Sequence, residues 1–104
     1  MAEALYALEK LADAVAALAT GSGRVRDRLF EASTYLTRVR PEDIPDEDLR
    51  RAFIGVMDDD LSYAQPQGDE GRILATLRII NDEEACSVAR RILDLHRELD
   101  RLLR

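Results

Sequence analysis

Three consecutive carboxylates, Asp58–Asp60, form the group of residues in this sequence that most resembles a cation site. Carboxylate oxygens are the ligands that Ca²⁺ and Mg²⁺ prefer, and the spacing from Asp58 to Asp69 matches the length of a calcium-binding loop. Such a loop needs a glycine where this chain has Tyr63. The neighbouring apolar residues also place the run inside a helix, where successive side chains point about 100° apart and cannot meet on one ion. We therefore expect a solvated acidic face, with no metal and no cofactor.

An arginine pair precedes the only histidine, because Arg90 and Arg91 lie six and five residues before His96. This spacing resembles the arginine and histidine motif of the HEPN helical ribonucleases, and the resemblance covers one predicted helix. It implies an RNA-cleaving site in a dimer cleft, where Arg91 and His96 act on the scissile phosphate and the ribose hydroxyl. The alternative interpretation is a histidine at the edge of a helical bundle, paired with Asp100 one turn later.

Two further groups carry weaker chemical signals. The turn Gly21–Arg24 resembles an anion-binding nest at a helix start, but it follows a helix and lacks the lysine of a phosphate loop. Cys86 is the single cysteine and falls in the first turn of the last predicted helix, a position where thiols are often activated. Without a second cysteine or a nearby histidine, we expect Cys86 to be a buried or half-buried inert thiol. No residue is therefore favoured as catalytic, and Arg91 and His96 are the remaining candidates.

The composition limits the classes of function that the chain can serve. It has 104 residues, of which 46% are hydrophobic and 35% charged, with a net charge of −6. This hydrophobic share supports a packed core, whereas the negative charge disfavours direct binding to nucleic acid or to an anionic membrane. The single cysteine and the absence of a long apolar run favour a cytoplasmic protein without a membrane span. The bias towards arginine and alanine is typical of a GC-rich bacterial or phage gene.

The elements that must position these residues are amphipathic helices. Apolar residues recur at alternating steps of three and four, and no window alternates with the period of a strand. The expected helices span about 2–19, 24–39, 46–64, 70–79 and 82–103, and the last two are either separate or one long bent helix. Because the connections are short, we predict an all-α, up-and-down helical bundle of four long helices plus one short helix (Glu70–Ile79), forming a single domain over 1–104.

The first and last predicted helices carry the clearest apolar seams. In the first helix the predicted seam is Leu8, Leu11, Val15 and Leu18, widened on one side by Leu5, Ala12 and Ala19. In the last helix it is Ala85, Val88, Ile92, Leu95, Leu99 and Leu102. Asn81 and Glu84 have the spacing of a capping box, which predicts the start of that helix. Asp46 is the predicted N-cap of the third helix.

The last helix also carries a second apolar row, formed by Cys86, Ala89, Leu93 and Leu103. A helix that is apolar on two sides is buried on both or contacts another chain. We therefore expect self-association or a partner helix, with the following partner-binding residues: Leu93, Leu95, Leu99, Leu102 and Leu103.

These observations favour a non-catalytic protein–protein interaction module, acting as an accessory or regulatory subunit through its apolar helix faces. Arginines at the rim would pair with carboxylates of the partner. One alternative is the HEPN-like ribonuclease that uses Arg91 and His96. Another is an acidic nucleic-acid mimic that blocks a DNA-binding protein through the segments 42–48, 58–60 and 69–70. That mimic would require an uninterrupted acidic surface.

Overall fold

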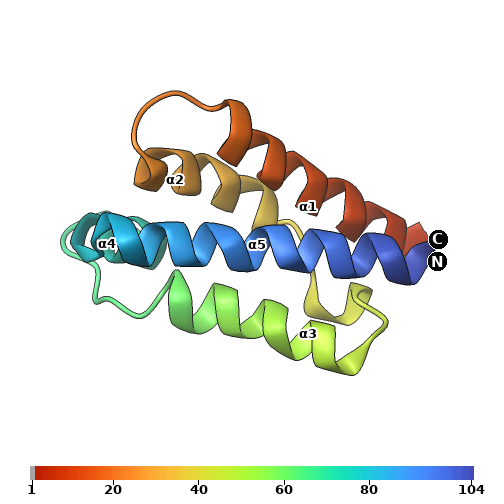
Figure 1. Cartoon of the computed structure of the whole chain (residues 1–104). Coiled ribbons are helices and arrows are strands. Elements are labelled where there is room, and N and C mark those ends of the chain that lie inside the picture. The colour runs from red at the N-terminus through yellow and green to blue at the C-terminus, as the bar shows by residue number, and fades with distance from the viewer. Residues whose placement is uncertain (1) are drawn as a thin grey trace.

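The computed structural model describes residues 2–104, which form five α-helices and no β-strand (Figure 1). The α-helices are α1 (Ala2–Thr20), α2 (Val25–Leu36), α3 (Glu47–Ile54), α4 (Arg72–Ile79) and α5 (Asp82–Leu103). A 3₁₀ turn, η1 (Pro41–Asp43), precedes α3, and a π-helical segment, η2 (Gly55–Asp60), continues it. The predicted all-α class is confirmed. None of the helices in residues 2–104 combines the length and apolar content that crossing a bilayer requires.

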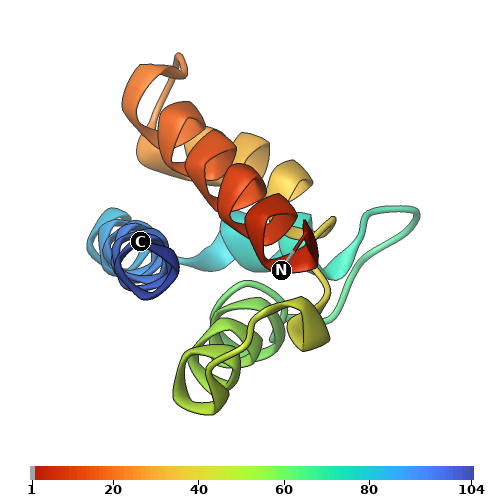
Figure 2. The same ribbon diagram turned by 90° about the vertical axis from the view of Figure 1, so that its right-hand side faces the viewer.

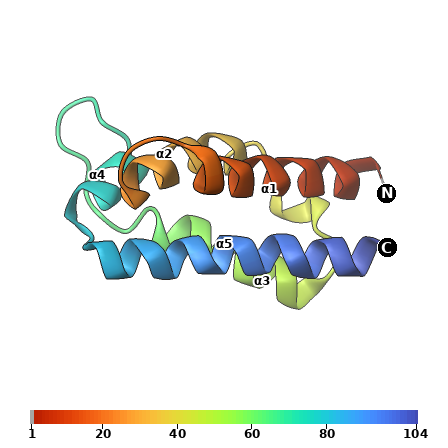
Figure 3. The same ribbon diagram turned by 45° about the horizontal axis from the view of Figure 1, so that its top comes forward.

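The helices alternate in direction, as in the predicted up-and-down bundle. Figure 1 shows α1, α2, α3 and α5 running back and forth along one axis, with α4 at the end where α3 finishes. Viewed from one end, α5 has α1 on one side and α3 on the other (Figure 2). The count of four long helices is approximate, because α3 has 8 α-helical residues and reaches the length of α2 only together with η2. Figure 3 shows the loop between α3 and α4 projecting at the α4 end.

The buried face of α1 differs from the predicted seam. Its fully buried residues are mostly small: Ala4, Ala7, Leu11, Ala14 and Ala17. Leu8, Val15 and Leu18 are half-buried, whereas Leu5 is 52% exposed and Ala12 and Ala19 are exposed. The prediction was wrong at these last three residues. It widened the leucine stripe on the wrong side, whereas the alanines on its other side let the α1 backbone approach α2 and α5 closely, and this places the alanine ridge inside.

A glycine-containing turn joins α1 to α2. The Gly21 N–H donates to the Ala17 carbonyl at 2.9 Å, and a Cβ on Gly21 would lie 2.5 Å from that same oxygen. Gly23 has φ +88°, a conformation that favours glycine. The Asp27 carboxylate then accepts the Arg24 N–H at 3.0 Å. The chain's own aspartate therefore fills the position where the nest interpretation would place an anion.

The segment between α2 and α3 is fixed by local hydrogen bonds. The α2 helix ends at Leu36 rather than Val39, because the next turn is closed by short-range bonds such as Val39 N–H to the Leu36 carbonyl. Arg50 then donates to the Ile44 carbonyl from Nε and Nη2, at 3.0 and 2.8 Å. The predicted cap of α3 is confirmed, since the Asp46 carboxylate accepts the Leu49 N–H at 2.9 Å.

Candidate functional site

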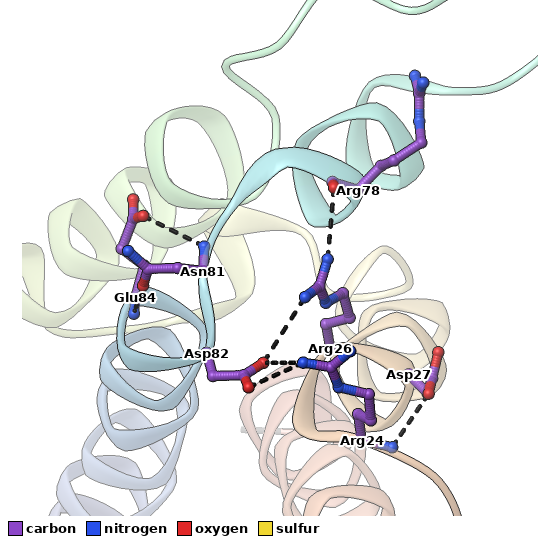
Figure 4. A network of polar contacts seen from close by, with 7 residues as sticks. All are labelled: Arg24, Arg26, Asp27, Arg78, Asn81, Asp82 and Glu84. Carbon is purple, nitrogen blue, oxygen red and sulfur yellow. Dashed lines mark hydrogen bonds and ion pairs between the residues drawn. The ribbon is translucent and has the colours of Figure 1, made fainter.

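The long helix α5 is positioned by contacts at its N-terminus. The Asn81 side chain accepts the Glu84 N–H at 2.7 Å, and the Glu84 carboxylate accepts the Asn81 N–H at 3.2 Å, which confirms the predicted capping box. Nη2 of Arg24 donates to both carboxylate oxygens of Asp82, at 3.1 and 2.9 Å (Figure 4). This hydrogen-bonded guanidinium lowers the pKa of the Asp82 carboxyl below its ordinary value. The start of α5 is thereby tied to the start of α2.

A second arginine completes this network at the same end of the bundle. Nη2 of Arg26 lies 3.7 Å from an oxygen of Asp82, and its Nη1 donates to the Arg78 carbonyl at 3.4 Å (Figure 4). Arg78, whose carbonyl belongs to the last turn of α4, also pairs with Glu70. The network therefore links α2, α4 and α5 at this end of the bundle.

The predicted seam of α5 is buried for most of its length. Ala85, Val88 and Ile92 are core residues, and Leu95 and Leu99 are 4% and 0% exposed. Leu99 is therefore not available to a partner in this structure, and Leu95 offers only a small part of its surface. Of the remaining predicted partner-binding residues, Leu102 is 48% exposed and Leu93 and Leu103 are half-buried. The seam is therefore part of the core, and only its last turn is exposed to solvent.

One groove lies between α1 and α5, and we call it the α1–α5 groove. Its α5 side is the predicted second apolar row, represented by Cys86, Ala89 and Leu93. Val15, Leu18, Ala19 and Val25 form most of the opposite side, and Arg28 and Arg90 complete the lining of a cavity of about 440 Å³. Cys86 is exposed, so the expectation of a buried or half-buried thiol was wrong. The second apolar row of α5 remains partly accessible to solvent because α1 covers only part of it.

A second groove lies on the other side of α5, against α3 and η2, and has two lobes. We call it the acidic groove. One lobe, of about 360 Å³, has an apolar lining of Leu49, Ala52, Gly55, Val56 and Leu95. The other, of about 300 Å³, contains Tyr63, Ile80, Ser87 and Val88. Five carboxylates belong to the two linings: Asp59, Asp60, Glu84, Asp94 and Glu98.

An ion pair divides the acidic groove. Nη1 of Arg91 lies 2.7 Å from Oδ2 of Asp60, and both residues line both lobes. Asp59 and Asp94, which face the 360 Å³ lobe, have no hydrogen bond or ion pair within residues 2–104. The run Asp58–Asp60 is therefore an acidic face, as the sequence indicated, and two of its members border a groove. Within residues 2–104, no three His, Cys, Asp or Glu side chains gather closely enough to hold a metal ion.

Arg91 and His96, the remaining catalytic candidates, do not lie together. Five residues of α-helix rotate a side chain by about 140°, so they leave α5 in different directions. Arg91 points to the acidic groove, whereas His96 is two turns from Ala89, which faces the α1–α5 groove. His96 makes no hydrogen bond or ion pair within residues 2–104, and Asp100 pairs with Arg104 at 2.6 Å instead. The expected His96–Asp100 pair is therefore not formed.

Several residues of the acidic groove were not identified from the sequence as a group. Glu84, Asp94 and Glu98 lie on one side of α5 by helical spacing, and the packing of α3 and η2 against α5 brings Tyr63 to the same surface. The available signal was the position of Asp94 and Glu98 next to the buried Leu95 on the helix. Comparison with known proteins gives no match to this chain among family models, curated proteins or solved structures.

Proposed function

We propose that this protein is a non-catalytic interaction module, an accessory or regulatory subunit that binds a partner helix in its α1–α5 groove. The observation that supports this proposal is the apolar row of α5, with Leu93 and Ala89 at its centre, which α1 leaves partly open. Burial of such a row releases about 25 cal/mol for each Å² of apolar surface removed from water. The row therefore provides a driving force for association that the fold itself does not use.

The charge at the rim indicates the character of the partner. Arg28 and Arg90 are the only charged residues of the groove lining, and Arg90 has no hydrogen bond or ion pair within residues 2–104. Arginine pairs with carboxylates through two parallel hydrogen bonds. We therefore infer a partner helix with an apolar stripe flanked by glutamate or aspartate.

The native cysteine supplies the test, because Cys86 is exposed and lines this groove. The probe is a synthetic amphipathic peptide with leucines at helical spacing and glutamates on their flanks. We expect it to slow alkylation of Cys86 by a maleimide, and we expect Leu93→Glu to abolish that protection. Gln65→Glu adds the same charge in a loop that lines neither groove, and this control variant should retain the protection.

The protein concentration separates two kinds of occupant. Protection of Cys86 that rises with protein concentration alone would support an interaction module whose partner is a second copy, and sedimentation equilibrium would show the dimer. An alkylation rate that neither the peptide nor a high protein concentration changes would contradict the proposal. Circular dichroism of Leu93→Glu establishes that a negative result comes from a folded variant.

No observation favours either alternative function. The ribonuclease hypothesis needs Arg91 and His96 to act together, and they leave α5 in different directions. The nucleic-acid mimic needs an uninterrupted acidic surface, but each predicted acidic segment carries an arginine ion pair. These pairs are Arg40–Glu42, Arg51–Glu47, Arg91–Asp60 and Arg78–Glu70.

A further inference from the structure

The acidic groove has the dimensions of a helix-binding surface. It follows α5 from Glu84 to Glu98, four turns that measure about 21 Å. Its apolar floor on α5 is formed by Val88 in one lobe and Leu95 in the other, which lie two turns and about 10.5 Å apart. A helix lying alongside α5 presents residues i and i+7 at the same interval. The two lobes can therefore receive two apolar side chains from one face of one helix.

Each lobe is large enough for such a side chain. The volumes are about 360 and 300 Å³, whereas an apolar cavity of about 150 Å³ already accommodates benzene. Tyr63, at the border of the smaller lobe, is 47% exposed and adds an aromatic face. An aromatic face attracts both apolar groups and cations.

The charge of the lining indicates whether a bound helix should be positively or negatively charged. Five carboxylates and one arginine line the two lobes. The arginine is paired with Asp60, and the carboxylates of Asp59 on η2 and Asp94 on α5 have no partner within residues 2–104. The larger lobe is lined by α3 and η2 on one side and by α5 on the other, so these two carboxylates come from opposite walls. A bound helix with cations on both flanks would meet one carboxylate on each side.

We propose that the acidic groove binds an amphipathic helix of a partner protein with apolar residues at i and i+7 and arginine or lysine on both flanks. The apolar anchors enter the lobes on either side of the Arg91–Asp60 ion pair, and the cations meet Asp59 and Asp94. This inference goes beyond the proposed function, because it uses the opposite side of α5 and a partner of opposite charge. The two grooves would allow α5 to contact two different helices at once.

The probes are two synthetic peptides that share one leucine pattern. The basic peptide has arginines on the flanks of the leucines, and the acidic peptide has glutamates at the same positions. Fluorescence anisotropy measures the Kd of each for the full chain carrying Leu93→Glu, a change that removes binding of the acidic peptide to the α1–α5 groove and lies outside the acidic groove. We expect the basic peptide to bind at least tenfold more tightly than the acidic one to the groove, and its affinity to fall when salt is raised. Basic peptide should leave the alkylation rate of Cys86 unchanged.

Matched variants locate the binding site. Asp59→Asn combined with Asp94→Asn should raise the Kd of the basic peptide roughly tenfold, since the loss of each ion pair lowers the affinity a few-fold. Glu9→Gln combined with Glu31→Gln changes the net charge by the same amount at exposed positions outside both grooves. This control should change the Kd of the basic peptide by no more than about twofold, because the peptide's affinity depends on the carboxylates of the groove and not on the total charge.

An aromatic substitution tests the smaller lobe. Tyr63→Ala should raise the Kd of the basic peptide about threefold or more, because it removes an exposed ring from the lining. Phe30→Ala removes another exposed ring, from α2, and should have no effect.

Three results would overturn the inference. These are failure of the basic peptide to bind at millimolar concentration, equal affinity for the two peptides, and equal weakening by the groove pair and the control pair. Because Cys86 reports only on the α1–α5 groove, failure here leaves the proposed function untouched, and the reverse also holds. Thermal unfolding of each variant establishes that it is folded.

Discussion

The alanine ridge of α1 makes Ala14→Leu a sharp test of how this bundle is packed. Ala14 is 0% exposed in the core, whereas Ala12, two residues earlier, is exposed. A leucine at position 14 adds three carbon atoms to the fully buried face of α1, and such overpacking typically costs about 1–3 kcal/mol. A leucine at position 12 adds the same atoms in solvent, where surface substitutions change stability by about 0.5 kcal/mol or less.

The two variants can be compared by urea and thermal unfolding, followed by far-UV circular dichroism. For a domain of this size, 1 kcal/mol shifts Tm by about 4–8 °C. Ala14→Leu should therefore lower Tm by about 4 °C at least, and Ala12→Leu by about 4 °C at most. The periodicity of the sequence predicts that Ala12 faces the core, so the comparison also decides between the two orientations of α1. Equal destabilisation by both variants, or a larger effect at Ala12, would refute the structural assignment.

Three further predictions follow from backbone geometry and from charge. Gly55→Ala should raise the free energy of unfolding by about 0.4–1 kcal/mol, because Gly55 has helical φ and ψ and open space where a Cβ would lie. Gly21→Ala should lower it by about 1–3 kcal/mol, since the new Cβ would collide with the Ala17 carbonyl oxygen; a neutral urea midpoint would contradict this. The Arg24 hydrogen bond lowers the pKa of Asp82 in the folded state, so its stabilisation is present above the ordinary carboxyl pKa and is lost as the pH falls through the lowered value. Asp82→Asn should therefore lower Tm at pH 7 and have a smaller effect below about pH 4, whereas a pH-independent difference would argue against the ion pair.

The helices were predictable because their signals are local. The capping box at Asn81 and the buried row from Ala85 to Leu99 lie within one stretch of chain, and the structure confirms both. The Asp46 cap of α3 is another such signal. The orientation of α1 was less predictable, because two overlapping stripes were both apolar. The choice between them depends on how closely α2 and α5 approach, which is not encoded within α1.

The grooves could not be predicted as surfaces, since each combines residues that are distant in sequence. The second apolar row of α5 was identified, but the α1–α5 groove exists only because α1 leaves Cys86 and Leu93 partly uncovered. In the acidic groove, Asp60 and Arg91 pair across 31 positions, and no periodicity links them. The π-helical hydrogen bonds of η2 were also missed, because the apolar pattern around Val56 is compatible with an ordinary α-helix.

The wide turn of η2 has a consequence for how the chain tolerates changes in length. The Leu61 N–H bonds to the Val56 carbonyl five residues earlier, and both side chains are buried. An α-helix makes this bond over four residues, so one residue between them is supernumerary. Deleting Asp58, which is exposed and unpaired within residues 2–104, would restore α-helical spacing while both anchors kept their places. Homologous chains could therefore differ by one residue here without any shift in the core downstream.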